Sequence, residues 1–103
     1  MNLVRASNAQ KLNEVSKIVE GTLRAQHLTQ AALMEVINEI LAPHDSYTFQ
    51  AINLWATGKR LPGYWQMKHI MDTPFVGTQK LWLKGMAADI LAVLRPDIWL
   101  PKG

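Results

Sequence analysis

The sequence predicts an all-α fold, a compact bundle of about five helices in a single domain of 103 residues. Three observations predict it. Apolar residues recur at the three- and four-residue spacing of helices that bury one face. Helix-capping residues and prolines divide the chain into segments of helical length. No stretch shows the strict apolar–polar alternation of a half-buried strand, and a hydrophobic fraction of 49% is enough for one modest core.

The first two helices are indicated by their caps. Ser7 and Gln10 match a capping box. The positions that follow with helical spacing are Leu12, Val15, Ile18, Val19, Thr22 and Leu23. Thr29 is the expected N-cap of a second helix. Its apolar face is Leu33, Val36, Ile37, Ile40 and Leu41. Pro43 ends this helix, because proline has no amide donor and disfavours helical geometry at the residue before it.

A third helix is expected to start at Thr48 and stop at Gly58. Pro62 suits the first position of a short fourth helix that runs to about Met71, since proline is favoured there. The sequence 72–74, Asp-Thr-Pro, ends it. The residues expected in the core from this segment are Trp65, Met67, Ile70 and Met71.

Thr78 is the expected cap of a fifth and strongly apolar helix. Its apolar residues are Leu81, Leu83, Met86, Ala87, Ile90, Leu91 and Leu94. Arg95 and Pro96 close it, and residues 97–101 are expected to form an extended tail.

Composition excludes several classes of protein. Cysteine is absent, so there are no disulfides, no thiolate catalysis and no cysteine-ligated metals, and the chain suits a reducing cytoplasm. No apolar run reaches the roughly 18–20 residues of a membrane span, and the N-terminus has no signal-peptide pattern. We therefore expect a cytoplasmic protein that does not enter a membrane.

Charge is distributed unevenly along the chain. Residues 29–58 contain the acidic Glu35, Glu39 and Asp45 and no lysine or arginine, whereas seven basic residues face three acidic ones from Lys59 onward. Basic clusters of this kind suit contact with phosphates, and the alternative is an ordinary solvated basic surface.

Enzyme signatures are missing. The histidines, His27, His44 and His69, never form a helical i, i+4 ligand pair. The sequence 57–59, Thr-Gly-Lys, resembles part of a phosphate-binding loop, but the upstream glycine and the following Ser or Thr are absent. We expect no enzyme, no cofactor, no metal and no small-molecule substrate.

The stretch 47–62, YTFQAINLWATGKRLP, resembles the recognition-helix segment of Xre/Cro-type helix-turn-helix repressors. The residues that carry the resemblance are Thr48, Ile52, Trp55, Gly58 and Pro62. The resemblance implies a single helix-turn-helix domain over 1–103, with the helix-turn-helix region at 29–62. It implies a sequence-specific transcriptional regulator, of the repressor type, that binds double-stranded DNA and reads the major groove with helix 48–57.

By this resemblance Phe49, Gln50 and Asn53 would contact bases. Glutamine and asparagine can each bind adenine through two hydrogen bonds, and an aromatic ring can touch a thymine methyl group. The full set of expected DNA-binding residues is Thr48, Phe49, Gln50, Asn53, Thr57, Lys59 and Arg60. Of these, Thr48, Lys59 and Arg60 are expected near the DNA backbone.

The segment departs from the family in two places. Pro43, His44 and Asp45 interrupt the region where the family has the helix before the turn. Either the segment 29–41 is that helix and the turn is expanded, or residues 43–46 form a short distorted helix. Ala56 stands where the family commonly has an acidic residue.

The expected partners are double-stranded DNA and a second copy of the chain. Residues 78–100 are the candidate dimerisation helix and tail, with Ile90 in the apolar stripe and Trp99 in the tail. The alternative is that this helix completes the core of one chain. The alternative function is a small helical protein–protein interaction module, an inhibitor or adaptor of a host or regulatory protein, with an interface built on Trp82 and Trp99.

Overall fold

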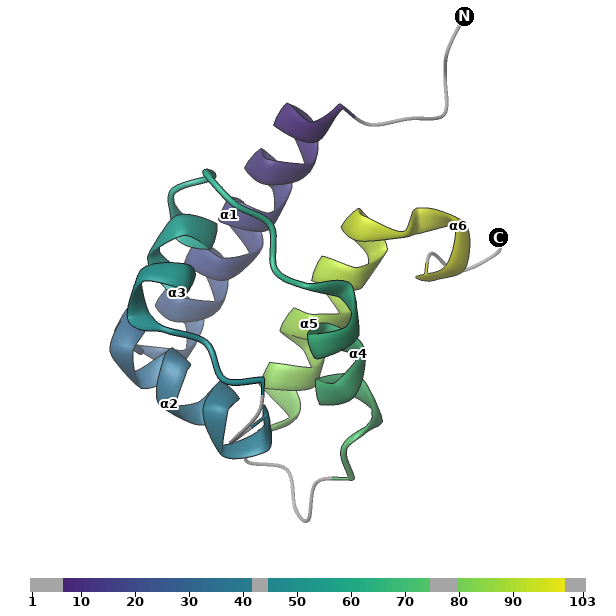
Figure 1. The fold of residues 1–103 in the computed structure, drawn as a ribbon. Coiled ribbons are helices and arrows are strands. Elements are labelled where there is room, and N and C mark those ends of the chain that lie inside the picture. Colours follow the sequence, from purple (N-terminus) through teal and green to yellow (C-terminus); the bar gives the residue numbers. More distant parts are fainter. Residues whose placement is uncertain (1–6, 42–44, 75–79, 100–103) are drawn as a thin grey trace, which may run out of the picture.

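The computed structural model describes residues 7–41, 45–74 and 80–99, and these contain six helices and no strand (Figure 1). The helices are α1 (Asn8–Gln26), α2 (Gln30–Leu41), α3 (Phe49–Ala56), α4 (Tyr64–Asp72), α5 (Leu81–Leu94) and α6 (Pro96–Trp99). The predicted all-α fold is confirmed.

The caps predicted for the first two helices are present. The Gln10 amide donates to Ser7 Oγ at 3.1 Å, and the Ser7 amide donates to Gln10 Oε1 at 3.0 Å. Thr29 Oγ1 accepts from the Ala32 amide at 3.1 Å. Because these bonds satisfy amides that have no partner within the helix, the sequence alone determines where α1 and α2 begin.

Three predictions about the second half of the chain are wrong. The fourth helix begins at Tyr64, after Gly63, and Pro62 is buried just before it. Trp65 is 74% exposed and lies outside the core, whereas Met67 and Ile70 are fully buried. The expected extended tail contains the one-turn helix α6, with Pro96 in the first helical position that suits it. Thr78, Pro43 and His44 lie outside the described residues.

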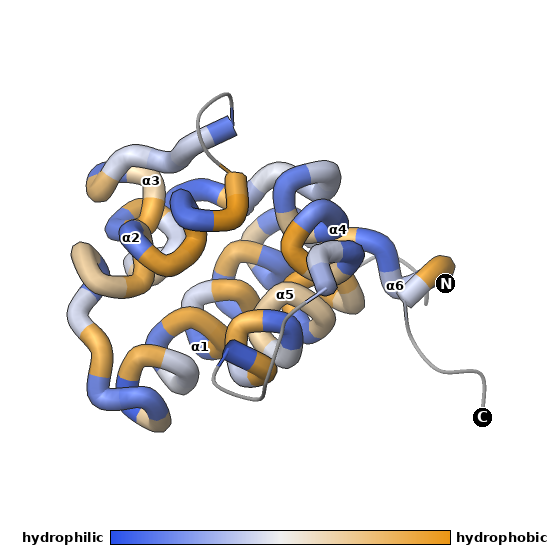
Figure 2. The backbone as a smooth tube through the Cα atoms, turned by 90° about the horizontal axis from the view of Figure 1, so that it is seen from below, coloured by the Kyte–Doolittle hydropathy of each residue, from blue (hydrophilic) through white to orange (hydrophobic). Residues whose placement is uncertain are grey.

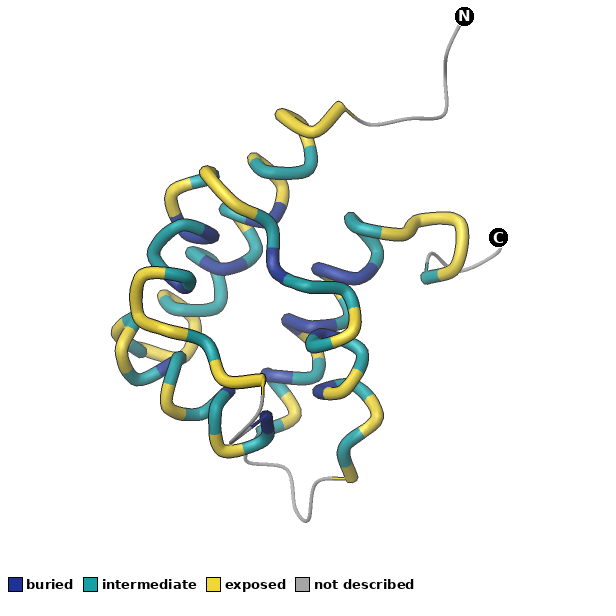
Figure 3. The backbone as a smooth tube through the Cα atoms, viewed as in Figure 1, coloured by how far each residue is buried: buried dark blue, intermediate teal, exposed yellow. Residues whose placement is uncertain are grey.

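The core is formed by α1 to α5, and α5 contributes most to it. Its buried side chains are Leu83, Met86, Ala87, Ile90 and Leu91. Figure 2 shows α5 between α1 and α4, and Figure 3 marks the buried positions along the backbone in dark blue. Ile90 has no exposed area, so this residue of the stripe considered as a dimer surface belongs to the core of one chain, whereas Leu81 of the same stripe is 51% exposed. Among the described residues, no helix has both the length and the apolar composition that crossing a membrane requires.

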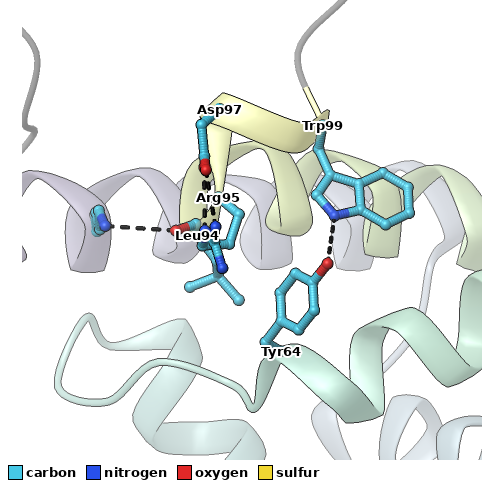
Figure 4. A network of polar contacts seen from close by, with 6 residues as sticks. Tyr64, Leu94, Arg95, Asp97 and Trp99 are labelled. Atoms are coloured by element: carbon cyan, nitrogen blue, oxygen red, sulfur yellow. Dashed lines mark hydrogen bonds and ion pairs between the residues drawn. The ribbon is translucent and has the colours of Figure 1, made fainter.

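The last turn of the described chain folds back over α4. The Trp99 indole Nε1 donates to the Tyr64 hydroxyl at 3.0 Å, and the Arg95 guanidinium pairs with Asp97 at 2.8 Å (Figure 4). The amides of residues 98 and 99 both donate to the Arg95 carbonyl at 3.0 Å, which closes the turn of α6. Trp99 is half-buried as a result.

Candidate nucleic-acid interface

Helix α3 has one buried face. Thr48 is its N-cap, and the Thr48 hydroxyl oxygen accepts from the Ala51 amide at 3.1 Å. Ile52 is fully buried and Trp55 is 1% exposed. The helix packs against both α1 and α2. Its orientation on the protein is therefore determined by core packing.

The start of α3 is bonded to α2. Asn38 in α2 holds the backbone of Tyr47 through two hydrogen bonds of 2.8 Å, one from the Asn38 amide group to the Tyr47 carbonyl and one from the Tyr47 amide to Asn38 Oδ1. The Tyr47 ring meets Trp55 edge-on at a centroid distance of 4.5 Å, and its hydroxyl accepts from the Gly63 amide at 3.1 Å. Burial raises the pKa of the Tyr47 hydroxyl above its ordinary value, although the bond from Gly63 opposes this.

The end of α3 is bonded to α1. The Ser16 hydroxyl donates to the Ala56 carbonyl at 2.6 Å. Gly58 has a φ of 74°, a left-handed conformation that suits glycine after a helix. This turn lets the amides of Lys59 and Arg60 donate to the Leu54 carbonyl at 2.8 and 3.3 Å. Both ends of α3 are therefore fixed to the rest of the protein.

The side of α3 opposite the core carries the expected base-contacting residues. Phe49 is 51% exposed, and Gln50 is exposed. Asn53 is half-buried, and its Nδ2 donates to Gln30 Oε1 at 3.1 Å. Gln30 was missed in the sequence. Its only signal there is its place directly after the Thr29 cap, and nothing in the spacing relates it to Asn53.

The two threonines of the expected set have structural bonds. Thr57 follows α3, and its hydroxyl donates back to the Asn53 carbonyl at 2.8 Å. Thr48 is occupied as the N-cap, although its hydroxyl proton is not used in that bond. The helix itself spans residues 49–56 and is shorter than the predicted 48–57, because the two threonines cap its ends instead of belonging to it.

Lys59 and Arg60 are both exposed, and within 7–41, 45–74 and 80–99 neither forms an ion pair. Ion pairs are formed elsewhere, by Lys68 with Asp72, by Lys80 with Glu39 and by Arg95 with Asp97. Helix α3 itself contains no charged residue. The positive charge beside α3 is therefore concentrated in the turn that follows it.

The two alternatives for the helix before the turn are partly resolved. α2 ends at Leu41, and α3 begins at Phe49. Asp45 and Ser46 belong to no helix, so a short helix does not extend over them, and residues 42–44 lie outside the described part. The connection from α2 to α3 thus fits the alternative in which 29–41 precedes a long turn.

Comparison of the chain with protein-family models, with curated proteins and with solved structures gave no match. The residues themselves determine what a ligand would meet at α3. An α-helix with its side chains is about 10–12 Å across, which fits the roughly 12 Å width of the DNA major groove, and the eight residues of α3 extend about 12 Å along the helix axis. The exposed Phe49 ring and the amides of Gln50 and Asn53 lie along this length, and the basic residues that follow form no ion pair with the rest of the described chain.

Proposed function

We propose that this protein is a repressor-type transcriptional regulator that binds double-stranded DNA sequence-specifically through α3. One observation carries the proposal: Phe49, Gln50 and Asn53 lie on the outer side of a helix whose inner face and both ends are fixed to the core. A fixed helix suits base reading, because discrimination between bases depends on the exact placement of hydrogen-bonding atoms.

The two amides supply the chemistry of base recognition. The Gln50 side chain forms no hydrogen bond to another described residue, so its amide group is available to a base edge. Asn53 uses one N–H in its bond to Gln30 and keeps its Oδ1 and a second N–H. An acceptor and a donor on one amide match the N6 amino group and N7 of adenine. The exposed ring of Phe49 suits a thymine methyl group.

Lys59 and Arg60 supply the contact with phosphates. Their side chains are exposed and unpaired within the described residues, so binding a phosphate breaks no ion pair described there. Phosphate contacts place a protein on the duplex without selecting sequence. One recognition helix reads only a few base pairs, and we therefore include a homodimer on a two-fold symmetric site in the proposal.

The test is selection of bound sequences from a pool of random duplexes, followed by affinity measurements at several salt concentrations. We expect a short two-fold motif to be enriched, and we expect affinity to fall steeply with salt because bound counterions are released. Binding without any enriched motif, or no binding at low salt, would refute the proposal.

A second candidate function is binding to a protein. The observation that favours it is Trp65, which is 74% exposed and meets Tyr64 edge-on at a centroid distance of 5.0 Å. Exposed tryptophans are frequent in interfaces. Trp82 and Trp99, which the sequence suggested for this role, are half-buried against the core. Loss of a partner on Trp65→Ala, with no salt dependence like that of DNA binding, would favour this candidate.

A further inference from the structure

Helices α1 and α5 lie side by side and run in opposite directions (Figure 1). The Lys11 ammonium near the start of α1 donates to the Leu94 carbonyl at the end of α5 at 3.5 Å, which fixes their relative register. Toward the other end of α1, a surface groove of about 400 Å³ is lined by residues of these two helices.

Six of the lining residues form three levels across the groove. Because the helices are antiparallel, a residue further along α1 faces one earlier in α5. Counting along the two helices from the contact between Lys11 and Leu94 gives the levels Lys17 with Asp89, Gly21 with Gly85, and Ala25 with Trp82. The first level pairs opposite charges, the second pairs two glycines, and the third pairs a small residue with a large aromatic one.

The two glycines have no role in the packing of a single chain. A Cβ atom at Gly21 or at Gly85 would meet nothing within 4 Å. Glycine inside a helix lowers stability relative to alanine, because it loses more backbone freedom on folding. Two such positions opposite each other allow another helix to approach the groove closely.

The charged level is also unused within one chain. Lys17 and Asp89 are exposed, and neither forms an ion pair with another residue that the structure describes. The surface therefore offers one cation and one anion, with two glycines beside them. A partner that satisfies both must present an anion and a cation in the reverse arrangement.

We propose that this groove is the interface with a second copy of the same chain, related by a two-fold axis parallel to α1 and α5. Such an axis places α1 of each copy over α5 of the other. Lys17 then faces Asp89 of the partner subunit, and Gly21 faces Gly85 of the partner subunit. Ala25 faces Trp82 of the partner subunit. Each contact occurs twice, as two-fold symmetry requires.

This interface is different from the dimer surface that the sequence suggested. Ile90, the centre of that surface, is inside the core, whereas the groove lies on the outer side of α1 and α5. The interface does not depend on DNA binding by α3, since none of its six residues belongs to that helix or its turns.

Charge reversal tests the pairing by sedimentation equilibrium. Wild type should dimerise, and Lys17→Asp or Asp89→Lys alone should raise the dissociation constant at least about tenfold, because each creates two like-charge contacts. An equimolar mixture of the two variants should form heterodimers about as tight as the wild-type dimer, since every contact is then between opposite charges. Glu35→Lys is the control. It changes the net charge by the same amount as Asp89→Lys, but on the exposed face of α2, and it should leave association unchanged.

Glycine substitution tests the close approach independently of charge. Gly85→Leu should remain folded, because the monomer has open space at this position; at concentrations where neither protein dimerises, its unfolding temperature should be at or above that of wild type. The same variant should be monomeric at concentrations where wild type dimerises, because the added side chain separates the two helices. A monomeric wild type at the highest soluble concentration would overturn the proposal. It would also be overturned by single charge variants that dimerise normally, by a mixture that forms no heterodimer, or by a dimeric Gly85→Leu.

Discussion

Replacing Gln50 with alanine tests base reading with little effect on the fold. The side chain is exposed and forms no hydrogen bond to another described residue, so the free energy of unfolding should change by less than about 0.5 kcal/mol. Asn53→Ala removes the 3.1 Å bond to Gln30 and should cost about 0.5–1.5 kcal/mol of stability. Both variants should remain folded at room temperature.

The expected loss of discrimination is larger than these stability changes. A good bidentate contact is worth about 1–3 kcal/mol of preference for the correct base, which corresponds to roughly 5- to 150-fold in affinity. Each variant should lose this preference at one base position of the half-site and keep it at the others. Non-specific affinity should hardly change, because Lys59 and Arg60 remain.

Gln30→Ala separates the bond to Asn53 from the base contact itself. Gln30 holds the Asn53 amide in the free protein, so its removal should weaken discrimination at the Asn53 position and leave the Gln50 position unchanged. In the double variant Gln30→Ala/Asn53→Ala, the loss at that position should equal the loss caused by Asn53→Ala alone, because the two residues act through one amide.

The assay is a binding profile over all single-base variants of the selected site, measured for wild type and each mutant at fixed salt. Circular dichroism of each variant confirms that it is folded. If Gln50→Ala and Asn53→Ala bind more weakly but keep the wild-type profile, α3 does not read bases, and the reasoning from its exposed side is refuted.

Four further predictions concern affinity, folding and pH. Lys59→Ala with Arg60→Ala should lower affinity for all duplexes alike and flatten the salt dependence, as measured by fluorescence anisotropy. Trp55→Ala should lower the free energy of unfolding by about 3–5 kcal/mol in urea titration, because a buried ring leaves a cavity. Ile90→Glu should prevent folding, because the buried carboxylate has no partner; a well-folded variant would contradict the burial of Ile90. Tyr47 has a raised pKa in the folded state, so its contribution to stability should be complete below about pH 10 and fall as the pH rises above it.

Matched variants distinguish these effects from general damage. Trp65→Ala removes the same ring from an exposed position and should cost less than about 1 kcal/mol. A similar cost for Trp55→Ala would contradict the assignment of the faces of α3. Tyr47→Phe should abolish part of the alkaline loss of stability; an unchanged pH profile in Tyr47→Phe would mean that other groups cause it. Equal DNA affinity of wild type and the Lys59/Arg60 variant would favour a protein partner.

Local signals predicted most of the helices because each acts within a few residues. The capping box of Ser7 and Gln10 and the cap at Thr29 are bonds between residues three positions apart, so the sequence contains both partners. Trp65 was misassigned because its neighbours Met67 and Ile70 are buried, and only packing against other helices determines which residues of a short helix face the core. The bond between Gln30 and Asn53 joins residues 23 positions apart and has no sequence pattern.

The resemblance to Xre/Cro-type repressors is carried by residues whose roles in the structure are structural. Thr48 caps α3, Ile52 and Trp55 are buried, Gly58 adopts a left-handed turn and Pro62 is buried. A capped and packed short helix that ends in a left-handed turn favours these five residue types whether or not the protein binds DNA. The pattern therefore argues for how the segment folds, and it leaves the outward positions unconstrained. A function in DNA binding must depend on those positions, which is why substitutions of the outer amides and of the basic turn decide the proposal.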